Sequence, residues 1–456
     1  MSTTATTPVP SENGSLRREK VLDVEQPAVE EKPTAPAREP APEPISPFHP
    51  SQFPDGGKDA WLCLLGAAFC LFCSFGWLNC VGVFQSYYSQ NQLRDYSASQ
   101  IAWISSLEIF VMFLPGPIVG FFYDNYGSKP LLLVGGFFHV FGLMMTSLCT
   151  EYYQFILAQG ICSPLGLNCI FNAGINTIPT WFLKKRGLAF GMMAAGSGLG
   201  GVIFPIMASH LIPRIGYGWT MRTFGFVILG LLLIALATVK SRLPPKPRKW
   251  QLVVFMEPFQ DGRFVFTIIP AFVFFFGLFI PINYLEVQAL EGGMSQRLGG
   301  YLLSILNAAS IFGRIIPGAL ADKFGPYNFQ SVMAYISGII VLAIGLTAST
   351  NAAFIVYAVL YGFASGAYVS LLPAQITSIS KVEQIGVRTG VMFSLTSFAG
   401  LASNPVAGAL LGHGGNGSGS DYDKLSIFAG CLLMGGAVLF TLARMYVTHW
   451  KLFAIA

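Results

Sequence analysis

Twelve apolar runs of roughly twenty residues constrain the fold of this chain more than any other feature. A helix of about 20 apolar residues is long enough to cross the hydrocarbon core of a bilayer. Backbone groups in hydrocarbon must be hydrogen-bonded internally, which favours helices. The sequence therefore predicts an all-α integral membrane protein with twelve transmembrane helices. The runs lie near residues 61–88, 101–122, 130–150, 153–179, 187–211, 219–239, 264–288, 300–320, 329–348, 352–378, 387–411 and 425–447.

Charged residues are scarce in these runs and concentrated elsewhere. They make up 11% of the chain, against about 25% in soluble proteins. Residues 1–58 alone hold 15 of them, and the first 54 residues contain eleven prolines, which predicts a disordered tail. The eight cysteines all lie in apolar runs without metal-ligand spacing, so we expect neither a metal site nor a cofactor.

The distribution of Lys and Arg predicts the orientation in the membrane. The tail side carries 21 of these residues, the opposite loops carry 5, and Arg314 lies within a span. By the positive-inside rule both termini are cytosolic, and we expect the plasma membrane. Asn416 begins a glycosylation sequon in the last outer loop. The predicted divisions are a cytosolic tail (1–58), a six-helix bundle (59–240), a cytosolic linker (241–263), a second six-helix bundle (264–449) and a short tail (450–456).

A loop motif occurs twice, after the second span of each half. Gly, Asp and Gly recur at an offset of 198 residues, each copy accompanied by a lysine. A single copy could be a simple tight turn. Two copies predict pseudo-symmetric halves of the kind found in secondary transporters, with the aspartate accepting hydrogen bonds from a helix N-terminus as a releasable latch. The predicted gating residues are Gly120, Asp124, Gly127 and Lys129 in the first half, and Gly318, Asp322, Lys323 and Gly325 in the second.

Three further segments support a resemblance to a known family. They are Asp55-Gly56-Gly57 followed by Ala60-Trp61, the stretch from Trp181 to Gly201, and the stretch from Ile305 to Gly325. With these segments the chain resembles the major facilitator superfamily, specifically its monocarboxylate-porter type found in fungi. The resemblance implies two rocking six-helix bundles around a central substrate site.

Arg314 is the first candidate for substrate binding or coupling. An arginine inside a span costs at least ~2.5 kcal/mol, so it faces a cavity or a partner by default. It either pairs with an anion or forms a structural salt bridge. Animal lactate carriers, which the chain resembles through this family, have an arginine at the matching position. They also have an aspartate where this chain has Ser310 and a lysine where it has Asn79, so this chain departs from lactate-type symport.

Glu108 in the second span is either a proton site or a residue that faces the lipid headgroups. His139 in the third span is a possible titrating group, although a packing role is commoner. Asn168, Asn172 and Asn176 follow at i+4 spacing, which places three amides on one helical face. Those amides either join helices or contact substrate. Further polar interruptions that we predict to line the substrate site are Asn283, Tyr284 and Tyr368.

These observations predict a secondary active transporter rather than an enzyme. The five histidines are scattered, and no phosphate-binding P-loop occurs, so we expect a proton gradient to drive transport. The expected partners are a small-molecule substrate, a proton moved with or against it, and the bilayer; we expect no nucleic acid and no obligate protein partner. The first hypothesis for the cargo is a small organic acid or related metabolite. The alternatives are export of a larger secondary metabolite and, third, vitamin-type uptake.

Overall fold

The helices of the computed structural model follow the predicted apolar runs closely. The structure describes residues 52–245, 247–411, 419–451 and 454. Within them, 11 helical segments, two of which contain the breaks described below, are long and apolar enough to cross a membrane. One of these, α9 (Arg186–Thr238), has 53 residues and a non-helical break at Gly216, where φ is 76°. A helix of that length extends for about 80 Å, so α9 crosses twice. The predicted all-α membrane fold is confirmed.

The first half of the chain contains the helices up to α9. They are α1 (Lys58–Cys73), α2 (Phe75–Leu78), α3 (Val81–Gln90), α4 (Ala98–Phe113), α5 (Gly116–Tyr126), α6 (Ser128–Thr146), α7 (Tyr152–Phe155), the π-helix η2 (Ile156–Cys162), α8 (Ser163–Thr177), the 3-10 helix η3 (Ile178–Thr180) and α9.

The second half begins after a short linker. Its elements are α10 (Val253–Met256), η4 (Glu257–Gln260), α11 (Gly262–Glu291), α12 (Gln296–Phe324), α13 (Pro326–Ile340), η5 (Val341–Gly345), α14 (Asn351–Ser378), η6 (Val382–Gln384), α15 (Ile385–Leu410) and α16 (Gly419–Val447).

The first membrane span is broken near its middle. α1 ends at Cys73, α2 has only four residues, and α3 begins at Val81. The Ser74 hydroxyl donates to the Cys70 carbonyl at 2.6 Å at the first break. α2 packs tightly on α9, because a Cβ added at Gly76 would lie 2.9 Å from the Cα of Gly200. Discontinuous helices of this kind mark binding sites in secondary transporters.

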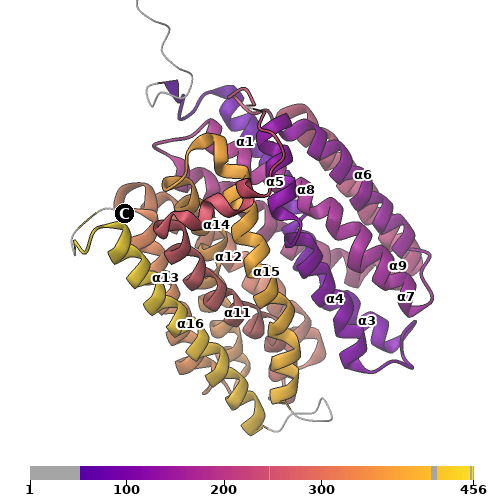
Figure 1. Ribbon diagram of the computed structural model, residues 1–456. Helices are drawn as coiled ribbons and strands as arrows, with labels where there is room; N and C mark the ends of the chain where they lie inside the picture. Colours follow the sequence, from indigo (N-terminus) through magenta and orange to yellow (C-terminus); the bar gives the residue numbers. More distant parts are fainter. Residues whose placement is uncertain (1–51, 246, 412–418, 452–453, 455–456) are drawn as a thin grey trace, which may run out of the picture. The chain divides into compact units, whose positions relative to one another are not determined.

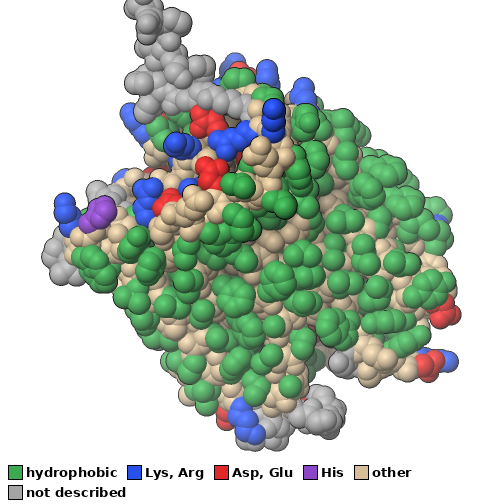
Figure 2. Space-filling view, viewed as in Figure 1, with side chains coloured by type: hydrophobic (Ala, Val, Ile, Leu, Met, Phe, Trp, Pro, Cys, Tyr) green, Lys and Arg blue, Asp and Glu red, His purple; other side chains and the backbone are tan. Residues whose placement is uncertain are grey.

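Helices of the two halves meet along two lines. α12 packs on α9, and α15 packs on α5 and α4. Figure 1 shows α3 to α9 on one side and α11 to α16 on the other. The flanks of this body are covered with apolar side chains, while charged groups gather at the end where α1 begins (Figure 2). Large exposed residues such as Phe137 (64% exposed) suit contact with lipid.

Candidate functional site

Two aspartates each bind the N-terminus of a helix from the opposite half. The Asp124 carboxylate on α5 accepts hydrogen bonds from the backbone N–H groups of Gly386 and Val387, each at 3.0 Å. The Asp322 carboxylate on α12 accepts from Gly187 at 2.6 Å and Leu188 at 2.9 Å. Helix N-termini carry partial positive charge, which favours these anions. We call the end of the body that carries both aspartates the latch end.

The motif glycines allow the helices to approach at the latch end. A Cβ added at Gly120 would overlap the backbone carbonyl of Gly386, and one at Gly318 would lie 2.5 Å from the carbonyl oxygen of Gly187. Gly127 and Gly325 follow their helices with φ of 80° and 93°, a conformation that favours glycine. Lys129 and Lys323 are exposed. Asn125 exchanges two hydrogen bonds of 3.0 Å with the backbone of Arg248 in the linker.

Asp55 holds the start of α9 from within its own half. Its Oδ1 accepts from the backbone N–H groups of Leu183 and Lys184, both at 2.7 Å, and of Lys185 at 3.2 Å. The Trp61 ring packs edge-on against the Phe182 ring at 5.5 Å. Two of the sequence segments that supported the family resemblance are therefore in direct contact.

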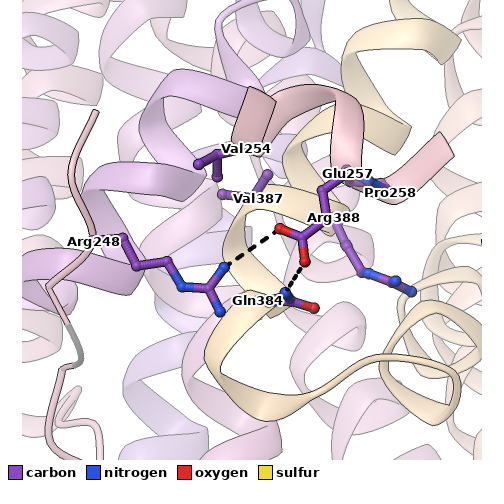
Figure 3. Close-up of a pocket in the computed structure, with 7 residues that line it drawn as sticks. All are labelled: Arg248, Val254, Glu257, Pro258, Gln384, Val387 and Arg388. Carbon is purple, nitrogen blue, oxygen red and sulfur yellow. Dashed lines mark hydrogen bonds and ion pairs between the residues drawn. The ribbon is translucent and has the colours of Figure 1, made fainter. Parts of the chain in front are cut away.

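Residues of the linker contact the start of α15, whose first amides bind Asp124 (Figure 3). The Glu257 carboxylate accepts from the Gln384 amide at 2.7 Å and lies 3.6 Å from the Arg248 guanidinium. Arg388 donates to Asp261 at 3.1 Å. Burial acts to raise the pKa of Asp261, but hydrogen bonds from Arg263 and Arg388 outweigh it and hold the pKa below its ordinary value. These charged groups pair with one another, so together they hold the linker against α15.

Arg314 crosses from α12 to α9. One of its terminal nitrogens donates to the Ala194 carbonyl at 3.0 Å and to the Ser197 hydroxyl at 2.8 Å. Asn79 donates to the Ser197 carbonyl at 3.3 Å, so these two predicted site residues converge on one residue that the sequence analysis did not select. Arg314 is buried, and its Nε has no partner among the described residues. No carboxylate of the described residues forms a salt bridge with it.

Ser310 does not take the place of the missing aspartate. Its hydroxyl donates to the Asn307 carbonyl at 2.7 Å within α12, and it packs against Gly366 of α14. Arg314 instead occupies the position that Gly116 has in the first half, where a Cβ would lie 2.7 Å from the Gly390 carbonyl oxygen. An arginine therefore stands in the second half where the first half has a closely packed glycine.

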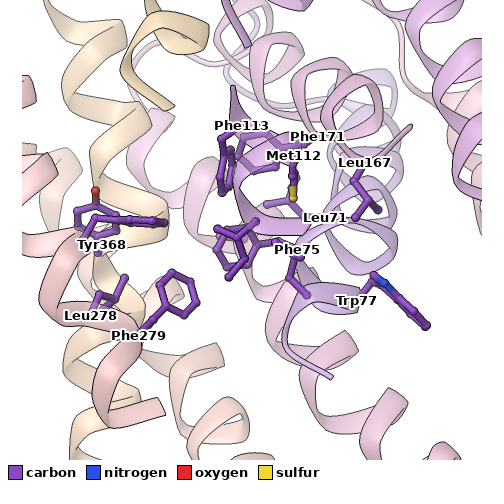
Figure 4. Packing of buried hydrophobic residues seen from close by; sticks show 14 of the residues in the cluster. Leu71, Phe75, Trp77, Met112, Phe113, Leu167, Phe171, Leu278, Phe279 and Tyr368 are labelled. Carbon is purple, nitrogen blue, oxygen red and sulfur yellow. The ribbon is translucent and has the colours of Figure 1, made fainter. Parts of the chain in front are cut away.

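A cluster of aromatic rings joins the halves between these helices (Figure 4). Phe113 of α4 stacks on Phe393 of α15 with ring centroids 5.1 Å apart, and Phe171 of α8 meets the same ring edge-on at 5.0 Å. Phe75 of α2 lies 6.5 Å from Phe279 of α11. The aromatic cluster, as we call it, comprises Phe75, Phe113, Phe171, Phe275, Phe279, Tyr368 and Phe393.

The cluster is apolar, and only one of its members was selected from the sequence. The Tyr368 ring lies 6.0 Å from the Phe275 ring in a tilted arrangement, and its hydroxyl donates to the Ala271 carbonyl at 2.9 Å. Asn283 and Tyr284 lie farther along α11 and are exposed and half-buried respectively. The sequence signal was only a high phenylalanine content, which does not say which rings meet.

The three asparagines of α8 are bonded mainly to each other. Asn176 donates to Asn172 at 3.2 Å, Asn172 donates to Asn168 at 3.0 Å, and Asn168 donates to the Met112 carbonyl on α4. This ladder joins α8 to α4. Of the described buried atoms, Asn176 Oδ1 is one without a hydrogen-bond partner. Asn416 lies outside the residues that the structure describes.

Glu108 is fully buried, so its alternative placement at the lipid headgroups is wrong. Its two oxygens accept from the Trp77 indole at 2.8 Å and the Gln159 amide at 3.1 Å. His139 is also buried, and its Nδ1 lies 2.9 Å from the Ser163 hydroxyl. Within the described part of the chain no lysine or arginine forms an ion pair with Glu108.

Twelve spans in two halves, closed at one end by paired aspartate latches, define a membrane transport protein. The chain belongs to the major facilitator superfamily, whose family model matches residues 61–403. The assignment agrees with the resemblance at the level of the superfamily.

Proteins similar to this chain are fungal transporters. It is 52% identical over 401 residues to "MFS-type transporter 1" of Ophiocordyceps sp., covering 88% of each chain. It is 45% identical to the "Fujikurins efflux protein" of Gibberella fujikuroi, covering 88% of this chain and 85% of that one. It is 40% identical to the "Aspyridones efflux protein apdF" of Emericella nidulans, with 86% and 79% covered.

A solved structure supports the fold. The fucose:proton symporter FucP of E. coli superposes with a TM-score of 0.65 at 16% identity, covering 84% of this chain and 98% of that one. At this identity the likeness concerns the fold alone.

Proposed function

We propose that this protein exports a bulky, mainly apolar secondary metabolite by alternating access, driven by a proton gradient. The observation that carries the proposal is the aromatic cluster between the halves. Aromatic rings offer large apolar surfaces, and the burial of apolar surface has little directional demand, which suits a large hydrophobic cargo. Two of the similar proteins are named as efflux proteins.

The first hypothesis, a small organic acid, has less support. A carboxylate of that size needs paired charges or several polar donors. The described residues offer Arg314 as the one cation at the junction of α2, α9 and α12, and one of its nitrogens already binds α9. Its unpartnered Nε remains available to a single acidic group on a larger cargo. Vitamin-type uptake has no specific support among the contacts of the described residues.

The proposed moving bodies are residues 59–240 and 264–449, joined by the linker 241–263. We propose that the latch end faces the cytosol, because basic residues predominate in the loops on that side. With both aspartates bound, the structure then represents a state that is closed to the cytosol. Both termini are cytosolic in this proposal, and the plasma membrane is the proposed location.

Comparative metabolite profiling tests the proposal. Cells with and without the gene are grown alike, and medium and cell extract are analysed by mass spectrometry. We expect one or more apolar metabolites to accumulate in the cells and decrease in the medium when the gene is deleted. Unchanged profiles in producing conditions would contradict export of a secondary metabolite.

A matched pair of variants assigns the effect to the cluster. Phe393→Ala removes the ring that meets both Phe113 and Phe171. We expect export to fall at least about tenfold, because the cargo loses an aromatic contact worth about 1.5 kcal/mol or more. Phe137→Ala removes an exposed ring on α6 and serves as the control. Equal export by both variants would argue against the cluster as the binding site.

A further inference from the structure

Glu108 lies at the centre of a buried network of neutral hydrogen-bonding groups. Beyond its bonds from Trp77 and Gln159, the Gln159 Oε1 accepts from the Tyr88 hydroxyl at 2.7 Å. The Tyr88 and Tyr217 hydroxyls are 2.9 Å apart. A buried carboxyl inside a membrane protein marks a functional site by default, with proton relays among its usual roles.

No neighbouring charge fixes the state of this carboxyl. The elements that pack on α4 are α3, η2, α8 and α15. Their only charged side chain is Arg388, which is bonded to Asp261 at the latch end. The titratable neighbours on the network are Tyr88, Tyr217 and Cys80, and His139 packs against the Trp77 ring at 6.0 Å.

The network extends away from the latch end. Tyr88 lies two residues before the end of α3, and Tyr217 directly follows the break at Gly216. The ring of Tyr87, which is only partly buried, stacks on Tyr217 at 5.2 Å. A proton that reaches Glu108 along these groups comes from the side opposite the cytosol in the proposed orientation.

Trp77 connects Glu108 to the aromatic cluster. It lies on the four-residue α2, between the two breaks of the first span, and Phe75 of the same helix belongs to the cluster. Figure 4 shows Phe75 facing the cluster and Trp77 on the side away from it. The indole N–H is a donor only. When a proton binds to the carboxylate oxygen, that oxygen becomes a weaker acceptor and the hold on Trp77 changes.

We propose that Glu108 is the proton-binding residue of this transporter and that α2 couples its protonation to the aromatic cluster through Trp77 and Phe75. The step is a reversible addition of one proton to the carboxylate, with no other bond made or broken. The proton is taken up from outside and released inside in exchange for the exported metabolite. This inference rests on the proposed export function.

Infrared difference spectroscopy of the full-length protein in liposomes tests the inference without a substrate. Between about pH 4 and pH 9, a range that covers ordinary and perturbed carboxyl groups, we expect a titrating carboxyl C=O band. It disappears in Glu108→Gln and remains in Glu108→Asp. It also remains in Glu286→Gln, the matched control at a half-buried carboxyl on α11. In Trp77→Phe the band moves to higher frequency, because one hydrogen bond is lost.

Two results would overturn the inference. One is the absence of any titrating band that depends on Glu108, as expected if the carboxyl only anchors Trp77 and Gln159. The other is a band that keeps its frequency in Trp77→Phe. If Glu108→Gln fails to fold, the Glu108→Asp and Trp77→Phe spectra still decide. The titration needs no cargo, so a failed export assay leaves it interpretable, and a failed titration leaves the export proposal standing.

Discussion

Adding one methyl group at Gly120 tests whether the latch holds the two halves closed. An alanine Cβ there would overlap the backbone carbonyl of Gly386 on α15. Backbone atoms cannot rotate aside as a side chain can, so α5 and α15 must separate. Overpacking of this kind costs about 1–3 kcal/mol, which lowers the ratio of latch-closed to latch-open protein by about 5- to 150-fold. Any stretching of the bonds to Asp124 adds to that change.

Spin labels measure the separation directly. The labels are attached at Lys129→Cys and Lys381→Cys, because both lysines are exposed at the latch end on either side of this contact. The accessible native cysteines are first replaced by serine. We expect Gly120→Ala to increase the long-distance population in pulsed electron resonance. Gly230→Ala is the control, because a Cβ there meets nothing within 4 Å. Identical distance distributions in the two variants would show that the close approach at Gly120 does not hold the halves together.

Three further substitutions probe the remaining contacts. Asp322→Asn leaves one acceptor oxygen for two N–H groups and removes the negative charge, so we expect the closed state to lose about 1–3 kcal/mol of stability. Spin labels on Lys184→Cys and Lys323→Cys measure the separation, and an unchanged distance would count against the latch. Asp55→Asn should lower the melting temperature of the purified protein by weakening three backbone contacts, whereas Asp59→Asn, exposed in the first turn of α1, should not. Arg314→Met removes two hydrogen bonds to α9, and we expect export to fall at least about tenfold; wild-type export in that variant would exclude a role in transport.

The sequence was sufficient for the membrane fold because hydrocarbon imposes a strong and local rule. A span must be helical and apolar over most of its length, so its limits can be predicted within a few residues. The duplicated motif also predicted where Asp124 and Asp322 lie relative to their own helices. The N–H groups that they bind come from α15 and α9, between 134 and 263 residues away in the sequence. No local sequence pattern specifies these partners.

The candidate binding site was harder to predict for a physical reason. Polar residues are conspicuous in an apolar span, so Asn283, Tyr284 and the asparagines of α8 stood out in the sequence. The structure gives most of those amides partners on their own helix or its neighbour, and places phenylalanine rings between the halves instead. A phenylalanine that faces the other half and one that faces lipid look the same in a sequence of this composition. Ser197 was missed for a related reason, because its role depends on two side chains from other helices.

The N-terminus of α9 is shared by two carboxylates, and this has a consequence for the order of opening. Asp55 binds the amides of residues 183–185 from within the first half, while Asp322 binds those of 187 and 188 from the second. When the halves part, Asp55 remains bound to those amides, so its negative charge still offsets part of the positive charge at the start of α9. The α15 end is also tied to the linker, because the Gln384 amide donates to Glu257. We therefore expect the contact between α9 and α12 to part before the contact between α5 and α15.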